Sequence, residues 1–415
     1  MDFTEHLPKE SQNMNTVPKE MKLFVLILAL TALGLGFSND IISNYFKDAY
    51  QATAFQRGVI ELPRELPGIL CILVISLFSF ISDIRIAILA QVFSIAGIVY
   101  LGIFTPSYTV MTVFIFINSL GMHLFFVLQD SIGLALIKKG ETGKRMGQFK
   151  GVSTAFQMVA AILVFIGFRT GFFNFETPFK LPFLLAGAAF FMVMILLVRL
   201  QRRVHLPGSI HRKTRMVVRK EYRYYYILTI LFGAQKQIMM VYGPWVLIDL
   251  LGKKADTIAM LSMAGGLIGI FFIPALGRWM DRFGIKAMLY ADALSFILVY
   301  LVYGALTAGY HEGLLPLAGW AILPAYLIFI LDRMSTQMGL VRTVYLRAIA
   351  VHSSEMTPTL SVGISLDHMV TIIFAPLGGL IWGVWGPQYI FFLAAGLSLV
   401  NLYVAVKVEL PAGDH

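Results

Sequence analysis

Residues 181–199 read LPFLLAGAAFFMVMILLVR, a run whose only charged residue is Arg199 at its end. An α-helix rises 1.5 Å per residue, so about 20 apolar residues cross a hydrocarbon core about 30 Å thick. Similar runs recur along the chain of 415 residues, of which 58% are hydrophobic and 13% charged. Soluble domains carry about 25% charged residues, so this composition excludes an ordinary soluble enzyme and predicts a multi-span membrane protein.

Hydropathy predicts an all-α polytopic membrane protein with twelve transmembrane helices. The runs are long and continuous, whereas barrel strands are about 10 residues of alternating polarity. The predicted spans are 22–45, 58–81, 86–105, 109–136, 147–168, 181–199, 225–249, 257–276, 286–305, 315–341, 358–384 and 387–406. The second span is the least regular, because charged residues interrupt it.

The spans divide into two halves joined by a long basic loop. We predict a cytoplasmic N-terminal segment at 1–21, a six-helix bundle at 22–200, a basic cytoplasmic linker at 201–224, a second six-helix bundle at 225–406 and a cytoplasmic tail at 407–415. The first 20 residues lack the layout of a cleavable signal peptide, so the first span is expected to be retained. Many secondary transporters are paired bundles around a midplane site, so this organisation favours a transporter.

The basic residues set the expected orientation. Of the 33 Lys and Arg residues, about 24 lie on the side of the termini and about 6 on the other, a bias that predicts cytoplasmic termini. The formal charge of +10 is therefore mostly an orientation signal and predicts no nucleic-acid partner. The linker is interpreted as a solvated segment that meets anionic lipid headgroups. The single cysteine, Cys71, lies inside a span and excludes an intramolecular disulfide.

A cytoplasmic loop in the second half carries a recognisable pattern. Residues 277–286 read GRWMDRFGIK, which resembles the signature loop G-x-x-x-D-[RK]-x-G-x-[RK] of the major facilitator superfamily. The resemblance implies a latch in which Asp281 faces the start of the fifth span. Gly277 and Gly284 suit the tight turn, and Arg282 is expected to anchor the loop at the inner interface. The equivalent loop at 79–85, SFISDIR, keeps Asp83 and Arg85 but lacks both glycines, so a weaker or different first latch is expected.

The resemblance extends over the whole chain. The stretches QRGVIELPRELPGIL, KRMGQFKGVSTAF, GAQKQIMMVYGPWVL and LSVGISLDHMV look like those of a bacterial branch of the superfamily that implies no particular substrate. The family implies two six-helix bundles that bind a small-molecule solute between them. It also implies a multi-pass protein of the bacterial inner (plasma) membrane, which we expect to act as a monomer within the lipid bilayer.

Charged residues inside the spans identify candidate site positions. Each costs at least about 2.5–3.5 kcal/mol in the hydrocarbon interior, so such residues usually face a wet cavity or pair with each other. The predicted substrate-binding residues are Lys236, Arg333, Asp332, His123, Tyr242 and Gln157. Lys236 could bind a solute carboxylate or phosphate, or form a neutral structural pair with Asp332 or Asp367. Asp292 is interpreted as a structural partner.

Three residues are candidates for proton coupling. Asp367 and His368 lie in the eleventh span, and Asp40 follows two glycines in a first span that can bend. Structural pairing is the alternative for each. A metal site built from His123, His368 and the aspartates has no supporting ligand spacing, so no metal is predicted.

Two further features concern movement of the halves. Glu61 and Arg64, one helical turn apart in the second span, are expected to form an intrahelical pair or an outer gate. Two G-x-x-x-G patterns, Gly147 with Gly151 and Gly265 with Gly269, predict close helix contact between the fifth and eighth spans.

The sequence lacks the motifs of hydrolases, metalloproteases and P-loop ATPases. We therefore predict no enzymatic activity and no cofactor, with transport energised by an ion gradient, most simply of protons. The leading hypothesis is a secondary active transporter of a small anionic or zwitterionic solute by alternating access. A proton-driven exporter of drugs or amphiphiles is the alternative, and a non-coupled sensor or lipid scramblase comes third.

Overall fold

The computed structural model describes residues 19–39, 41–78, 80–137, 141–204, 219–352, 355–408 and 410, and all regular secondary structure in them is helical. The first half contains α1 (Lys19–Ser38), α2 (Ile42–Tyr50), α3 (Ala54–Val59), α4 (Glu61–Leu77), α5 (Asp83–Ile103), α6 (Tyr108–Leu136), α7 (Thr142–Arg169) and α8 (Leu181–Gln201). The second half contains α9 (Arg223–Trp245), α10 (Ala255–His311), α11 (Leu323–Gln337), α12 (Gly339–Ile349), α13 (Met356–Val384) and α14 (Gln388–Lys407). Short helices are η1 (Lys220–Tyr222), the π-helix η2 (Val246–Leu250) and η3 (Gly319–Ile322).

The helices account for the predicted membrane passes. In the described part of the chain, eight helices are long and apolar enough to cross a membrane. One of them, α10, has 57 residues, about 86 Å of helix, and is interrupted at Gly284 (φ 79°, ψ 162°). Glycine adopts this conformation at little cost, so α10 is two passes that meet at the signature loop. The pairs α3–α4, α9–η2 and α11–α12 complete the predicted twelve.

Breaks within the first two passes differ from the predicted continuous spans. The first pass ends as α1 at Ser38 and resumes as α2 at Ile42, and Asp40 lies outside the described residues. The second begins earlier than predicted, with α3, whose N-terminus is capped by Thr53 and Gln56 in reciprocal hydrogen bonds. A turn at Ile60 separates α3 from α4. These breaks let the chain change direction near one membrane surface.

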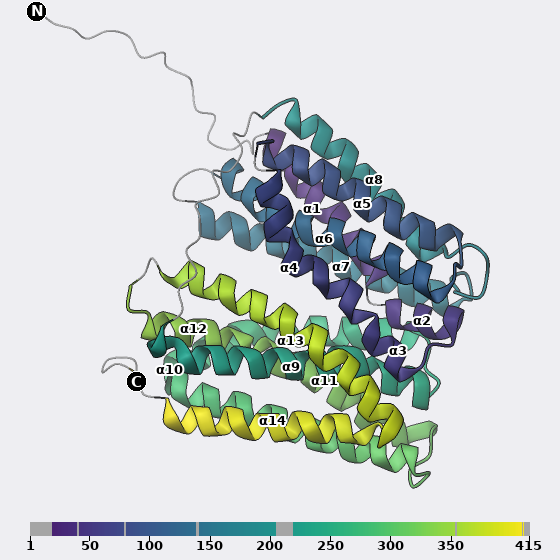
Figure 1. Ribbon diagram of the computed structural model, residues 1–415, viewed down its shortest axis with the longest axis vertical. Coiled ribbons are helices and arrows are strands. Elements are labelled where there is room, and N and C mark those ends of the chain that lie inside the picture. Colours follow the sequence, from purple (N-terminus) through teal and green to yellow (C-terminus); the bar gives the residue numbers. More distant parts are fainter. Residues whose placement is uncertain are drawn as a thin grey trace, which may run out of the picture.

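The two halves form two bundles that lie side by side (Figure 1). In the first, α5 packs on α6 and α8, and α1 on α7 and α8; in the second, α10 packs on α14 and α11, and α9 on α13. The start of α1, the end of α8 and the end of α14 lie at the same side, on the left in Figure 1. We call this side the terminal face. The side that carries α2 and α3 is called the opposite face.

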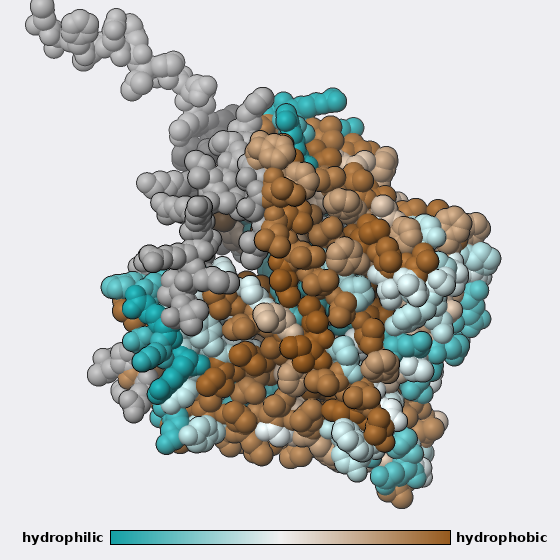
Figure 2. Space-filling model, viewed as in Figure 1, coloured by the Kyte–Doolittle hydropathy of each residue, from teal (hydrophilic) through white to brown (hydrophobic). Residues whose placement is uncertain are grey.

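The surface has the pattern expected in a bilayer. Figure 2 shows apolar side chains spread across the middle of both bundles, with hydrophilic side chains gathered toward the two ends. Large apolar side chains such as Phe271, Leu298 and Leu399 are exposed. Such continuous apolar surface is unusual for a soluble monomer and fits contact with lipid chains.

A carboxylate at the terminal face ties the start of α9 to the start of α13. Tyr222 donates a hydrogen bond of 2.6 Å to Glu355, and Arg219 forms an ion pair with the same carboxylate. The hydrogen bond from Tyr222, and then the one from Arg219, lower the pKa of Glu355. The linker residues 205–218, by contrast, lie outside the described residues.

The second bundle contains a buried ion pair. Asp292 of α10 accepts a 2.6 Å hydrogen bond from Arg342 of α12, and the two side chains are 1% and 5% exposed. The Arg342 guanidinium also lies 3.6 Å from the ring centroid of Phe232 in α9. This pair joins three helices of one half, in agreement with the structural role expected of Asp292.

Replacing Arg342 with Ala is therefore expected to destabilise the protein by about 3–5 kcal/mol, because Asp292 would be left buried and unpaired. The measurement is thermal unfolding of the purified protein in detergent. The double variant Asp292→Asn/Arg342→Met, which removes both charges, should recover much of the loss. Equal unfolding temperatures for wild type and Arg342→Ala would contradict the structural role.

Candidate functional site

The halves contact each other closely where α3 crosses α13. A Cβ atom added to Gly58 would lie 2.3 Å from the Ala375 carbonyl oxygen, and one added to Gly379 would lie 2.6 Å from the Ala54 carbonyl oxygen. Each glycine thus permits one backbone to approach the other. Tyr242 of α9 donates a hydrogen bond to the Ala375 carbonyl beside this crossing.

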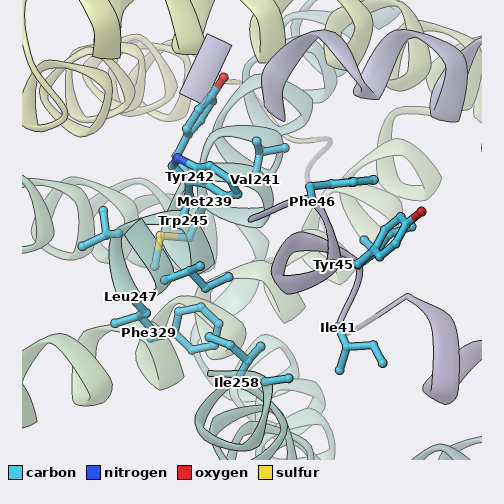
Figure 3. Close-up of a cluster of buried hydrophobic side chains, with 14 of the residues drawn as sticks. Ile41, Tyr45, Phe46, Met239, Val241, Tyr242, Trp245, Leu247, Ile258 and Phe329 are labelled. Carbon is cyan, nitrogen blue, oxygen red and sulfur yellow. The ribbon is translucent and has the colours of Figure 1, made fainter. Parts of the chain in front are cut away.

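An apolar core lies beneath this crossing and includes residues of both halves. Figure 3 draws side chains of this core from both halves, among them Tyr45 and Phe46 of the α2 segment and Tyr242 and Trp245 of α9. All four side chains are fully buried and belong to one cluster. The opposite face is therefore closed by packed side chains. Tyr242, predicted to bind substrate, is part of this seal in the present conformation.

Ion pairs between the halves reinforce the opposite face. Lys47 of α2 pairs with Asp249 of η2, and Arg169 at the end of α7 lies 3.7 Å from Asp256 at the start of α10. The side chain of Arg169 is largely exposed and the other three are partly exposed. Such pairs contribute little stability individually but can form and break as the halves move.

Three ionisable side chains meet deeper in the membrane. The ligand atoms of Glu65, His123 and His368 all lie within 4.8 Å of one another. His368 Nδ1 is 2.8 Å from Glu65 Oε2, and the rings of His123 and His368 are 5.4 Å apart between centroids. Glu65 and His123 belong to the first half and His368 to the second. We call these three residues the His–Glu cluster.

The approach of His368 depends on another glycine. A Cβ atom added to Gly68, one turn after Glu65, would lie 2.6–2.8 Å from the Cε1, Nε2 and Nδ1 atoms of the His368 ring. The ring therefore packs directly on the α4 backbone. Sequence reasoning predicted His368 and His123 but missed the role of Glu65 and Gly68, since only the packing of α4 on α13 brings them together.

The predicted gate pair Glu61–Arg64 forms within the first half. Glu61 accepts hydrogen bonds of 2.5 Å from Arg57 and from Arg64, and the side chains of Arg57 and Glu61 are only 2% and 0% exposed. The spacings i,i+4 and i,i+3 place these groups on one helical face. Because Arg57 and Glu61 are almost completely buried, the structure favours an intrahelical pair of Glu61 with Arg64 over a gate that opens.

Lys236 and Asp367 form an ion pair within the second half. Their charged atoms are 2.5 Å apart, and their side chains are 24% and 26% exposed. Phe232 lies one turn before Lys236, with its ring centroid 5.9 Å from the ammonium. Of the alternatives left open by the sequence, the structure contains the pair with Asp367. Because both side chains are partly exposed, a solute could still reach them.

Asp332 and Arg333 are adjacent in sequence but point in different directions. Asp332 is buried, 6% exposed, among residues of the second half. Arg333 is partly exposed, its guanidinium lies 5.3 Å from the centroid of Phe329, and its Cγ is 3.1 Å from a Cβ added to Gly265. Arg333 thus lies on the side of α11 that faces the first pass of α10. Among the described residues it forms no ion pair within 4 Å.

A cavity of about 540 Å³ runs along the first half between α1, α6 and α7. Its polar lining is Thr31, Asn39, Gln129, Asp130, Lys150, Ser153 and Gln157, and its apolar lining includes Phe24, Leu28, Phe126, Met146 and Phe149. Gln157 was among the predicted substrate-binding residues. The lining extends from the middle of α7 toward its start at the terminal face, so a solute could enter from that face.

The terminal face lacks the contacts that close the opposite face. In the described residues Asp281 and Arg282 are exposed, and Asp281 forms no hydrogen bond or ion pair. Arg282 stacks on Phe283, 5.2 Å from its centroid. Gly277 has nothing within 4 Å of an added Cβ. The expected latch between Asp281 and the fifth span is therefore absent from this conformation.

The first copy of the loop is built differently. Asp83 begins α5, is 5% exposed and accepts a hydrogen bond of 2.6 Å from Ser131 of α6, which is in the same half. Arg85 is exposed. This arrangement fits the expectation that the shortened loop would differ from the second copy.

The predicted glycine contact between the fifth and eighth spans is wrong in this conformation. Although α7 and α10 pack on each other, Gly147, Gly151 and Gly269 have nothing within 4 Å of an added Cβ, and Gly265 contacts Arg333 of its own half. The close crossing uses Gly58 and Gly379 instead. Gly58 belongs to no G-x-x-x-G pattern. Gly379 forms one with Gly383, which has nothing within 4 Å of an added Cβ, so spacing within one helix does not identify the crossing.

Two bundles closed at one face, with ionisable groups between them and a polar cavity open to the other, define the architecture of a membrane transporter. A model of the Major Facilitator Superfamily matches residues 23–366, and the chain belongs to that superfamily. It is therefore a member of a family of secondary transporters, in agreement with the absence of enzyme motifs.

Solved structures share the fold at low sequence identity. The nucleoside transporter NupG has a TM-score of 0.74 and 12% identity, covering 94% of this chain and 99% of its own. A bacterial homologue of the iron transporter ferroportin in an inward-facing state has a TM-score of 0.75 and 12% identity, with coverage of 94% and 99%. A D-xylose–proton symporter has a TM-score of 0.66 and 14% identity, with coverage of 92% and 96%. No curated protein matches the chain in sequence.

The glycine crossing gives a direct test of the closed face. In Gly58→Ala the new methyl would meet the Ala375 carbonyl and the Tyr242 hydroxyl at 2.3–2.4 Å, so α3 and α13 must separate. Overpacking of this kind costs about 1–3 kcal/mol, and we expect a lower unfolding temperature in detergent. Gly151→Ala is the matched control, since it gains the same helix propensity without a neighbour within 4 Å. Equal behaviour of the two variants would refute the close crossing.

Proposed function

We propose that the protein moves a small polar solute with an anionic group across the bacterial inner membrane by alternating access. The observation that carries the proposal is the asymmetry between the faces. Packed glycines, ion pairs and an apolar core join the halves at the opposite face, whereas a polar cavity leads toward the terminal face. A carrier needs this arrangement in one of its two end states.

The excess of Lys and Arg residues on the side of the chain termini supports a cytoplasmic location of the terminal face. With that orientation, the conformation described here faces the cytoplasm. The similarity in fold to a ferroportin homologue in an inward-facing state is consistent with this assignment. Conversion to the outward-facing state would separate α3 from α13 and bring the signature loop at Asp281 toward the start of α7.

Two cations of the second half support an anionic group on the solute. Lys236 is held by Asp367 but remains partly exposed, so a solute carboxylate or phosphate can compete for the ammonium. Arg333 has no ion-pair partner within 4 Å among the described residues and offers a planar donor fork to the same group. The amides that line the cavity, Gln129 and Gln157, would hold the polar remainder of the solute.

An exporter of amphiphilic compounds is the second candidate. Its support is the neutralisation of Lys236 by Asp367 together with the aromatic part of the cavity lining, Phe24, Phe126 and Phe149. Arg333 argues against it, because an unpaired cation disfavours cationic drugs. We place the anionic solute first for this reason.

We propose that a proton gradient drives the flux and that a single copy of the chain suffices. The chain carries no phosphate-binding loop, so the energy has to come from a gradient of an ion or of the solute itself. The similar fold of a D-xylose–proton symporter is compatible with coupling to protons.

Purified protein in liposomes can test the proposal. Pools of carboxylates, organic phosphates, amino acids, sugars and cationic drugs would be assayed for uptake with and without a pH gradient. We expect uptake from one anionic or zwitterionic pool, enhanced by the gradient. Lys236→Ala should reduce it by about 70- to 370-fold, since the anionic group of the solute would lose its cation, and an unpaired ion in the membrane interior costs about 2.5–3.5 kcal/mol. Lys407→Ala, at an exposed helix end, is the control.

The double variant Lys236→Ala/Asp367→Asn separates binding from folding. It leaves no unpaired charge at this position, so the protein should be as stable as the wild type while anion uptake remains lost. Uptake of an anion that survives in the double variant would contradict the role of Lys236. A response confined to cationic drugs would support the exporter instead.

A further inference from the structure

The His–Glu cluster contains the ligand set of a metal site. Glu65, His123 and His368 each offer one ligand atom, and these atoms lie within 4.8 Å of one another. The side chains of Glu65 and His368 are 14% and 17% exposed. Ligands of a four-coordinate zinc ion at about 2.0–2.2 Å from the metal are about 3.3–3.6 Å apart, so a shift of about 1 Å would complete the geometry.

His123 is held as metal-binding histidines usually are. Its Nδ1 lies 2.9 Å from the Ser119 carbonyl oxygen, which can only accept a hydrogen bond. Nδ1 therefore carries the proton, and in the neutral ring Nε2 has a free lone pair. The Ser119 hydroxyl donates its proton to the Arg64 carbonyl. Toward the same Nδ1, 3.0 Å away, the hydroxyl can therefore act only as a hydrogen-bond acceptor. A backbone carbonyl on the second nitrogen fixes ring orientation and raises ligand basicity.

His368 and Glu65 contribute the other two ligands from opposite halves. The 2.8 Å contact between His368 Nδ1 and Glu65 Oε2 is made by a proton, and a metal ion bound by both groups would replace it. The His368 ring packs on the α4 backbone at Gly68. The two ligands are thus held together by helix packing and need no loop to fold around the ion.

The donor types select the kind of metal. Two imidazoles and one carboxylate suit Zn²⁺, Co²⁺, Ni²⁺ or Fe²⁺, whereas Ca²⁺ and Mg²⁺ require mostly oxygen ligands. The nearby cations Arg57 and Arg64 are both hydrogen-bonded to Glu61. Glu65 is therefore the carboxylate of this group that faces the histidines.

We propose that Glu65, His123 and His368 bind one divalent transition-metal ion, which clamps α13 to α4 and α6 and holds the opposite face closed. The ligands come from both halves, so the site exists only while the halves are together at this depth. Binding energy available to one state and not to the other shifts the population toward the first. The ion would act as a brake on the conformational cycle, separate from the solute site at Lys236.

Metal binding can be measured on the full-length protein in detergent. The protein would carry no polyhistidine tag, and Zn²⁺ and Co²⁺ would be titrated by calorimetry and by the visible spectrum of Co²⁺. We expect one strong site per chain, weakened at least about 100-fold in Glu65→Gln, His123→Gln and His368→Gln. His311→Gln and His352→Gln, which alter exposed histidines outside the cluster, are the matched controls.

Two results would overturn the site. One is wild-type affinity in the cluster variants, and the other is an equal loss in the controls. Gel filtration and the unfolding temperature check that each variant is folded. His368→Cys offers a thiolate, which zinc binds well, and should recover more Zn²⁺ affinity than His368→Gln. Failure of this recovery in folded protein would also count against coordination by position 368.

The clamp has a separate test. Spin labels on Lys144→Cys of α7 and Arg347→Cys of α12, in a Cys71→Ser background, report the separation of the halves at the terminal face. Zn²⁺ should increase the population with the larger separation, and a chelator should reverse the change. A distribution that Zn²⁺ leaves unchanged, or shifts toward the shorter distance, would contradict the clamp. Accumulation of the metal inside proteoliposomes would also contradict it and would make the ion the cargo.

Discussion

The crossing of α3 and α13 is the contact on which the central arrangement depends. Because Gly58 and Gly379 have no side chain, the backbones of α3 and α13 approach until each glycine lies against a carbonyl group of the other helix. A side chain at either position would clash with that carbonyl. The same close approach brings His368 onto Gly68 and within hydrogen-bond distance of Glu65. A wider crossing would separate His368 from Glu65 and open the seal at the opposite face.

The cost of burying charge explains the pairing along the helices. Asp292 with Arg342, Glu61 with Arg57 and Asp367 with Lys236 are each within one half, and each removes an isolated ion from the membrane interior. Arg333, which forms no ion pair within 4 Å among the described residues, lies near water on a partly exposed face of α11. The distribution of charges thus separates positions that build each bundle from positions available to a solute.

Much of the fold could be predicted from the sequence because it depends mainly on the exclusion of apolar side chains from water. Apolar runs of membrane length predicted the twelve passes, and their grouping into two halves agrees with the bundles of Figure 1. Local breaks were harder to predict. The signature loop is helical up to a single break at Gly284, and the first span divides near residue 40, since tertiary contacts decide where a helix ends.

The candidate site could be predicted only by residue type. Charges inside spans identified Lys236, Asp367, His123 and His368, but partners depend on helix rotation and crossing, which periodicity does not determine. Glu65 illustrates the difficulty, since nothing in the sequence around it indicates its contact with His368 of the other half. The glycine patterns failed for the same reason. G-x-x-x-G describes one helix, whereas the observed crossing pairs one glycine from each half.

Exposure separates the permanent pairs from those that must break during a cycle. Within one half, Arg57–Glu61 and Asp292–Arg342 have side chains no more than 5% exposed. Between the halves, Lys47–Asp249 is 29% and 25% exposed and His368–Glu65 is 17% and 14% exposed. Separating a dry pair strands an ion at a cost of several kcal/mol, whereas water can replace the partner of an exposed one. A carrier that alternates between two states therefore needs dry pairs inside its moving parts and wetter pairs between them. These four pairs follow that rule, whereas Lys236–Asp367, which lies within one half but is 24% and 26% exposed, does not and is the pair that a solute could reach.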